Sequence, residues 1–143
     1  EIGAFPIRRR GDAFVEERIA ASLELFPVLA DRLDTPAGDL SGGLQQQLAL
    51  AKALVLEPEI LLVDELSLGL APVVVGELME VLERLKASGL TLVIVEQSVN
   101  VALQLADRAV FMEKGQVRFE GAARDLLERD DLLRAVFLGR EGG

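Results

Sequence analysis

The fold is decided by the stretch Leu40–Ser41–Gly42–Gly43–Leu44–Gln45–Gln46–Gln47 and by Asp64–Glu65, which follow it along the chain. The Gly-Gly step opens a run with the apolar spacing of a helix, and free N–H groups at a helix N-terminus favour an anion. Glycines let the backbone approach a phosphate closely, and the Ser41 hydroxyl adds a donor. Ser-Gly-Gly alone is more typical of a serine N-cap after a flexible turn. The glutamines that follow it and the register with the acidic pair favour a phosphate site instead.

The acidic pair Asp64–Glu65 closes an apolar run, Ile60–Val63, that has the length of a buried strand. Ligands of open α/β sheets bind at the carboxyl ends of the strands, which is where these two carboxylates are expected. One carboxylate could hold Mg²⁺, which prefers oxygen ligands, and the other could orient or deprotonate an attacking water. An apolar run followed by Asp-Glu is by itself more typical of a solvated loop. In register with residues 40–47, the pair predicts nucleoside triphosphate chemistry.

The composition excludes several classes of function. The 143 residues include no cysteine and no histidine, which rules out a thiolate or histidine metal site and a Ser-His-Asp triad within this sequence. Half of the residues are hydrophobic, but no apolar run approaches the roughly 18–20 residues of a membrane span. Lysine and arginine number 15 against 24 acidic residues, and the net charge of −9 argues against a nucleic-acid partner. The chain does not begin with Met, and we expect it to be part of a longer protein.

The spacing of apolar residues predicts an α/β chain. Two strands are expected at Ile60–Val63 and Thr91–Val95, with a helix between them that opens at Pro72 and ends at Gly89. Strands joined in this way are parallel, and we expect both to be buried on both faces. The other expected elements are a loop over 1–11, helices over 12–26 (with Asp12 as N-cap), 43–56, 98–106 and 122–138, a turn over 35–38, and a hairpin formed by 109–112 and 116–120.

Together these motifs resemble the C-terminal part of an ATP-binding cassette (ABC) ATPase. Leu40–Gln46 is similar to the ABC signature, and Ile60–Glu65 is similar to Walker B with its catalytic glutamate. Ser67–Pro72 resembles the D-loop of the ATP-binding subunits of branched-chain amino acid importers, and Val95–Gln97 occupies the switch-loop position. The resemblance covers nearly the whole chain. It implies a partial P-loop NTPase-like fold with a parallel βαβ core, a helical signature subdomain, and a C-terminal β-hairpin with helices.

The resemblance also implies a role for each motif residue. Asp64 would position Mg²⁺, and Glu65 would act on the hydrolytic water. Gln97 would stand where most ABC ATPases place a histidine that senses the γ-phosphate, and the branched-chain importers resemble this chain in carrying glutamine there. The residues that would contact ATP held by a partner subunit are Ser41, Gly42, Gly43 and Gln45.

The implied protein is an ATP-binding and ATP-hydrolysing subunit of an importer, with branched-chain amino acids as cargo, at the cytoplasmic face of the plasma membrane. Residues 1–56 would belong to the helical signature subdomain, and residues 57–143 would form the C-terminal part of the RecA-like catalytic core. The implied partners are a second ABC ATPase subunit and transmembrane permease subunits, with 12–56 docking on the permease. Nucleic acid is not among them.

One expected motif does not occur in this sequence. No GxxxxGK[ST] is present, so the loop that grips the triphosphate, with its lysine, must be supplied elsewhere. We therefore expect the 143 residues alone to be inactive and a complete parent protein to hydrolyse ATP. A second hypothesis is a non-catalytic interaction module that complements a partner's ATP site in trans. A third, an ABC-type ATPase of DNA repair or translation, is disfavoured because the sequence shows no long coiled coil or basic linker and is acidic.

Overall fold

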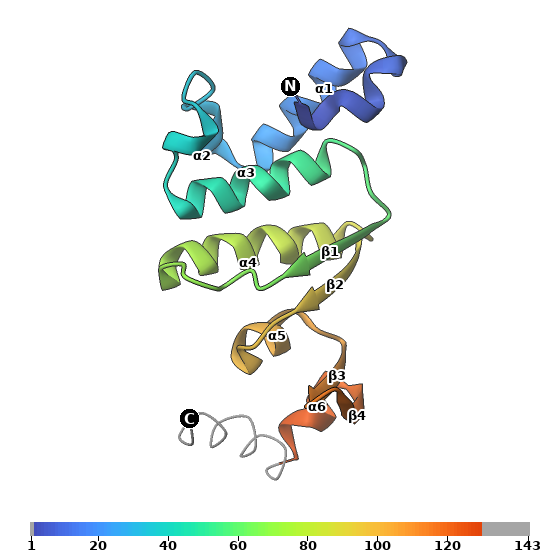
Figure 1. Cartoon of the computed structure of the whole chain (residues 1–143). Coiled ribbons are helices and arrows are strands. Elements are labelled where there is room, and N and C mark those ends of the chain that lie inside the picture. Colours follow the sequence, from blue (N-terminus) through green and yellow to red (C-terminus); the bar gives the residue numbers. More distant parts are fainter. Residues whose placement is uncertain (1, 130–143) are drawn as a thin grey trace. The chain divides into compact units, whose positions relative to one another are not determined.

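The computed structural model describes residues 2–129 (Figure 1). They divide into two compact units with a boundary between Val95 and Glu96, and each unit is described by itself. The first unit contains the 3₁₀ helices η1 (Ile2–Arg10) and η2 (Ala37–Asp39), the helices α1 (Asp12–Leu25), α2 (Pro27–Ala30), α3 (Gly42–Leu54) and α4 (Pro72–Ala87), and the strands β1 (Ile60–Asp64) and β2 (Thr91–Val95). The second contains α5 (Val99–Leu105), β3 (Arg108–Glu113), β4 (Gln116–Ala122) and α6 (Ala123–Leu127).

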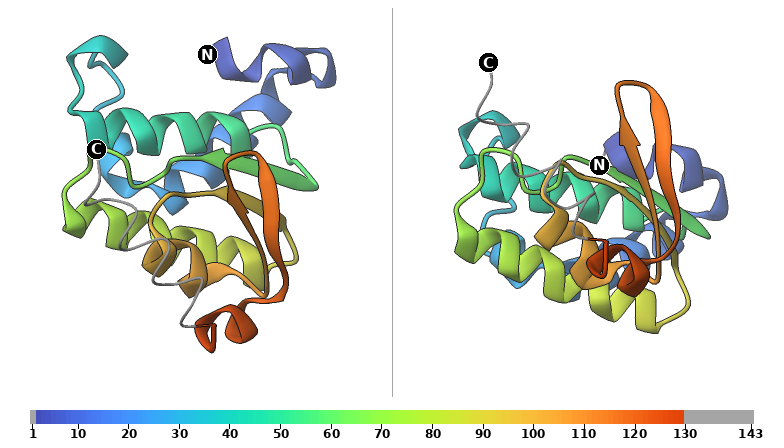
Figure 2. Two further views of the ribbon diagram at one scale, coloured as in Figure 1. Left: turned by 60° about the horizontal axis from the view of Figure 1, so that its bottom comes forward. Right: turned by 90° about the horizontal axis from the view of Figure 1, so that it is seen from below.

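The first unit contains the predicted βαβ arrangement. β1 and β2 pair in parallel, residue by residue, starting with Ile60 opposite Thr91. α4 makes the crossover between the two strands, and Figure 2 shows this path from two further directions. The helix starts at Pro72, whose fixed φ suits a first turn, in spite of the three valines that follow. It ends just before Gly89, whose φ of +98° is the left-handed conformation typical of the residue after a helix.

Only one face of the paired strands is buried, so the prediction that both faces are covered is wrong. On β1, Leu61 and Val63 are each 6% exposed, whereas Leu62 between them is 73% exposed. β2 follows the same alternation. A parallel pair needs a layer of helices on each side to be covered. Among residues 2–129 the other side is left open, and its apolar side chains, called here the exposed face, are those of Ile60, Leu62, Val93 and Val95.

Three leucines from two segments have the largest fully buried side chains of the described residues. They are Leu66, directly after the acidic pair, and Leu78 and Leu82 of α4. Burying one leucine contributes roughly 1.5–3 kcal/mol relative to leaving it exposed. Because Leu66 is only 1% exposed, it anchors the start of the 67–71 loop to the core. The other buried apolar residues of α3, β1 and α4 are Leu50, Ala51, Leu61, Val63, Met79 and Val81.

The start of the chain is helical, and the loop predicted over residues 1–11 is wrong. Ile2–Arg10 forms a 3₁₀ helix with Pro6 inside it. Glycine and proline there suggested a loop, but the fixed φ of proline, about −65°, lies within the range of a 3₁₀ helix. The predicted N-cap is also wrong, because Gly11 occupies the cap position with a φ of +97° and Asp12 lies in the first turn. A carboxylate in the first turn still favours the helix, through its interaction with the helix dipole.

The second unit contains the predicted hairpin. β3 and β4 pair antiparallel, and the two residues between them are Lys114, with a φ of +49°, and Gly115, with a φ of +78°. Two consecutive positive φ angles are typical of a type I′ turn, whose twist matches that of the strands. α5 lies within the helix predicted over 98–106. Of the helix predicted over 122–138, the structure shows α6, and the part from residue 130 on lies outside the described residues.

Within residues 2–129, none of the helices combines the length and the apolar character that crossing a bilayer requires. The division predicted between residues 1–56 and 57–143 stays a prediction. The boundary after Val95 separates two packing units, and it does not test which residues form a signature subdomain.

Candidate functional site

The first site element is the start of α3. Ser41 is the N-cap residue, and its Oγ accepts a hydrogen bond from the Leu44 N–H at 3.4 Å. The N–H groups of Gly42 and Gly43 precede this bond in the first turn, where a helix offers no internal acceptor. The serine cap that the pattern suggested is therefore present, and it leaves the two glycine N–H groups available in the same turn. A cap and an anion site are compatible here.

The two glycines have different surroundings. A Cβ atom built on Gly42 would meet no atom within 4 Å, so the backbone there can be approached from outside. A Cβ atom on Gly43 would lie 2.9 Å from Cγ1 of Val74, which is closer than real Cβ contacts come. Gly42 is thus open toward a ligand, whereas Gly43 is pressed against α4. The sequence pattern treated both as phosphate glycines and gave no sign of this difference.

Two of the three glutamines that follow the glycines also differ in exposure and in hydrogen-bond partner. Gln45 is exposed, and its Nε2 donates to the backbone oxygen of Ala37 in η2 at 3.1 Å. Gln47 is buried at 6% exposure, and its Nε2 donates to Oε2 of Glu77 on α4 at 3.2 Å. Gln45 remains the candidate for ligand contact because it is on the surface. Gln47 has a structural role that sequence reasoning missed, since its partner is 30 residues away in the chain.

The second site element is the carboxyl end of β1. Asp64 is the last residue of the strand and is exposed, opposite Val95 of β2. Glu65 leaves the strand with a φ of +49°, and its N–H donates to the Val95 oxygen at 2.8 Å. A left-handed conformation is uncommon for a non-glycine residue and occurs often at functional sites. The strand alternation therefore stops at Asp64, as expected for a chain that turns at this point.

The chemistry of this carboxyl end fits Mg²⁺ only in part. Residues 2–129 contain no group of three or more aspartates, glutamates, histidines or cysteines that could hold a metal ion by themselves. Mg²⁺ is usually bound through one or two carboxylates, with waters and substrate phosphates completing its shell. The exposed Asp64 meets that requirement as one protein ligand. A metal ion here would depend on a bound phosphate group.

Gln97 is the second residue of the second unit. It is exposed and lies two residues after the end of β2, just before the Ser98 N-cap of α5. Its unit is described separately from that of Glu65, so its predicted role stays a prediction.

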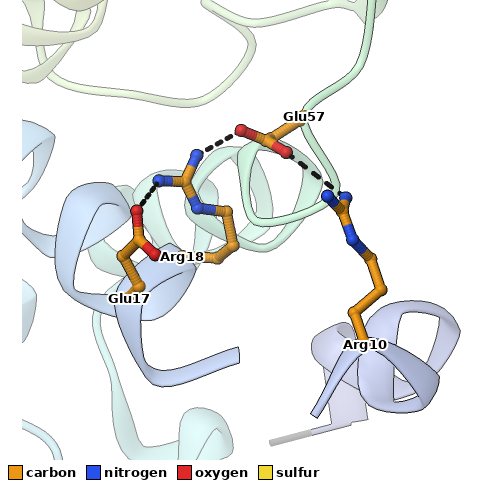
Figure 3. A network of polar contacts seen from close by, with 4 residues as sticks. All are labelled: Arg10, Glu17, Arg18 and Glu57. Carbon is orange, nitrogen blue, oxygen red and sulfur yellow. Dashed lines mark hydrogen bonds and ion pairs between the residues drawn. The ribbon is translucent and has the colours of Figure 1, made fainter. Parts of the chain in front are cut away.

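An ion-pair network holds the connection between α3 and β1 (Figure 3). Glu57 lies in this connection with a φ of +51°, and its two carboxylate oxygens contact Arg18 of α1 and Arg10 of η1. Arg18 also donates to Glu17 at 2.8 Å. The guanidinium of Arg10 lies 3.7 Å from the ring centroid of Phe14. Exposed ion pairs contribute about 1 kcal/mol or less each, so the network adds little stability to the segment that joins the two site elements.

Both site elements lie in a segment that matches a known protein family. The family model for the ABC transporter matches residues 12–67. The chain is 44% identical over 117 residues to the high-affinity branched-chain amino acid transport ATP-binding protein BraG of Pseudomonas aeruginosa, and the match covers 82% of this chain and 50% of that protein. The chain belongs to the ABC transporter ATP-binding family. It is also 38% identical over 120 residues to the probable branched-chain amino acid transport ATP-binding protein LivF of Archaeoglobus fulgidus, covering 81% of this chain and 50% of that protein.

Solved ABC cassettes share the fold. The ADP conformation of MJ1267, an ATP-binding cassette of an ABC transporter, superposes with a TM-score of 0.76 at 27% identity, over 90% of this chain and 51% of that one. The cassette MJ0796, in a dimeric post-hydrolysis state bound to ADP and Pi, matches with a TM-score of 0.55 at 34% identity, over 61% of this chain and 38% of that one. The predicted partial ABC ATPase fold is therefore confirmed. The ABC chain described here spans about half the length of the curated relatives it matches.

Proposed function

We propose that the chain is part of an ATP-binding and ATP-hydrolysing subunit of an ABC importer. The observation that carries the proposal is the pairing of a glycine-opened helix at Ser41–Gly43 with an acidic pair at the carboxyl end of a parallel strand. Both lie in the segment that matches the ABC transporter family. Bound ATP would supply the phosphoryl group, and Mg²⁺ held by Asp64 would offset the charge of its phosphates.

The residues at the end of β1 serve the subunit's own site in this proposal. Asp64 is exposed at the strand end and would hold the metal ion through one carboxylate oxygen. Glu65 would orient the attacking water and accept its proton. The bond from the Glu65 N–H to Val95 holds the backbone from which that carboxylate extends. Gln97 would take the switch-loop role that the family resemblance implies.

The residues at the start of α3 serve the other site of a dimer. The first-turn N–H groups of Gly42 and Gly43, the Ser41 hydroxyl and the exposed Gln45 amide would contact ATP held by a second ATP-binding subunit. The related cassette MJ0796 is described as dimeric in a post-hydrolysis state, which supports this arrangement. Residues 12–56 would dock on a transmembrane permease, and the subunit would then lie at the cytoplasmic face of the plasma membrane.

The proposed cargo is a branched-chain amino acid. BraG and LivF, the two relatives described above, both have names that specify branched-chain amino acid transport. Gln97 and the sequence Ser67–Pro72 also support this cargo, because both resemble the branched-chain amino acid importers. Uptake of labelled leucine by cells that lack the gene tests this assignment, and unchanged uptake would contradict it.

The catalytic assignment is tested by phosphate release from the complete polypeptide that carries this sequence. Glu65→Gln should lower turnover by at least about 100-fold, because a positioned general base contributes about 10²–10⁴-fold. Glu59→Gln, at the exposed other end of β1, is the matched control and should hydrolyse ATP at the parental rate. Turnover by Glu65→Gln equal to that of the control would remove Glu65 from the mechanism.

A second candidate function is an interaction module that completes a partner's ATP site in trans, which would need no phosphate-gripping loop of its own. The 143 residues contain no GxxxxGK[ST] motif, so they lack a phosphate-gripping loop of their own. We expect these residues alone to release no phosphate from ATP above background. Turnover by the isolated chain would contradict both proposals, whereas a complete polypeptide that is inactive alone but stimulates a partner ATPase would favour the module.

A further inference from the structure

α3 and α4 lie side by side and run in the same direction (Figure 1). Two contacts between them follow one another along both helices. Near the start of each helix, the Gly43 backbone faces the Val74 side chain, and about one turn further on Gln47 donates to Glu77 at 3.2 Å. We call these four residues the α3–α4 joint.

The first contact requires the absence of a side chain at position 43. A methyl group there would lie 2.9 Å from one Val74 methyl and 3.3 Å from the other. Valine has one strongly preferred rotamer in a helix, so Val74 cannot easily turn both methyls away. Alanine also forms helices better than glycine, so any loss of stability on Gly43→Ala would have to come from this contact.

The second contact fixes the rotation of the same helices. Gln47 is only 6% exposed, and a buried amide donor without an acceptor is costly. Its acceptor, Glu77, is exposed on α4 and carries the charge that makes this bond stronger than a neutral one. Helix α3 can therefore not turn about its axis, relative to α4, without breaking this bond.

The position of the joint in the chain gives it a function. α3 begins directly after Ser41, and α4 begins directly after the 67–71 loop that follows Glu65. We propose that the joint transmits the position of the Ser41–Gly43 element to the 67–71 loop, so that Gly43 and Val74 are positioning residues for ATP hydrolysis. Contact with ATP at one site then sets the geometry at the other. This role rests on the proposed function, whereas the packing role does not.

Thermal unfolding of the complete polypeptide that carries this sequence tests the packing role. Gly43→Ala should lower the unfolding midpoint by about 3–8 °C relative to Gly42→Ala, the matched control whose new methyl group meets no atom within 4 Å. Adding Val74→Ala should bring Gly43→Ala back to the midpoint of Val74→Ala alone. Equal midpoints for the two glycine variants would overturn the proposal, as would a double variant no more stable than Gly43→Ala. If Gly43→Ala does not fold at all, folding of the double variant supports the proposal.

Steady-state hydrolysis by the complete polypeptide tests the positioning role. Gly43→Ala should lower kcat at least tenfold, and Gly43→Ala/Val74→Ala should recover most of that loss with little change in the KM for ATP. If Gly43 matters only for close approach to a phosphate, a smaller side chain at position 74 cannot restore turnover. Recovery of the midpoint without recovery of kcat would therefore overturn the positioning role. If the parental protein itself hydrolyses no ATP, the proposed function fails, and the midpoints still decide whether the joint exists.

Discussion

The two faces of the β1–β2 pair have the same kind of sequence and very different environments. Leu61 and Leu62 are neighbours in one strand, yet Leu61 is 6% exposed and Leu62 is 73% exposed. The exposed face is as apolar as the buried one, and it ends at Asp64 and Val95, beside the candidate metal site. Contiguous exposed apolar patches, when large, usually mark an interaction surface. The strands therefore have the sequence of a pair covered on both faces, and residues 2–129 cover only one of them.

The largest expected effect distinguishes the two faces directly. Leu61→Asp places a charge among buried apolar groups and should lower the free energy of unfolding by more than about 4 kcal/mol. Leu62→Asp makes the same change one residue away on the exposed face, and its cost should be about 1 kcal/mol or less. Urea unfolding followed by circular dichroism gives both values. Similar losses for the two variants would mean that the faces do not differ in solution.

The next effect concerns the helix beneath the buried face. Leu82 of α4 is fully buried, and Leu82→Ala should cost about 2–5 kcal/mol through lost burial and the cavity left behind. Leu68→Ala is the matched control, because Leu68 is 69% exposed in the loop before the helix. The difference between the two unfolding free energies measures how much of the core depends on α4. A difference below about 1 kcal/mol would contradict the packing described here.

Substitutions on the exposed face should have the smallest effect on stability and the clearest effect on self-association. The chain should self-associate as its concentration rises, because this face and the strand edges beside it are uncovered. Leu62→Lys/Val95→Lys should shift the mass measured by light scattering toward that of a monomer. The unfolding free energy should change by about 1 kcal/mol or less. A parental chain that is monomeric at all concentrations would contradict this prediction, because the exposed face would then be stable in contact with water.

The elements with strong local signals were predictable from the sequence. The parallel strands, the Pro72 start and the Gly89 end of α4, and the turn at Lys114–Gly115 all follow from short-range rules of backbone conformation. The site elements at 41–45 and 64–65 could be recognised because each motif combines residue type with spacing. The roles proposed for them, at two different ATP sites of a dimer, remain predictions.

What could not be predicted depends on contacts between distant residues. An apolar strand predicts burial on both faces, but the pattern does not say whether the covering layer is present. The Gly43–Val74 and Gln47–Glu77 contacts join residues about 30 positions apart. The sequence around Gly43 or Gln47 does not indicate which distant residue each one contacts. Local composition also misled at η1, where Pro6 suggested a loop.

The contact between Gly43 and Val74 also limits the order in which this sequence can change over evolution. A larger residue at position 43 overlaps a valine methyl, so it can be accepted only after position 74 has become smaller. The reverse order passes through a destabilised intermediate that selection would remove. A smaller residue at position 74 removes the overlap and opens substitutions at position 43 that were closed before. The packing limit on the signature glycine is therefore set by a residue of a different helix.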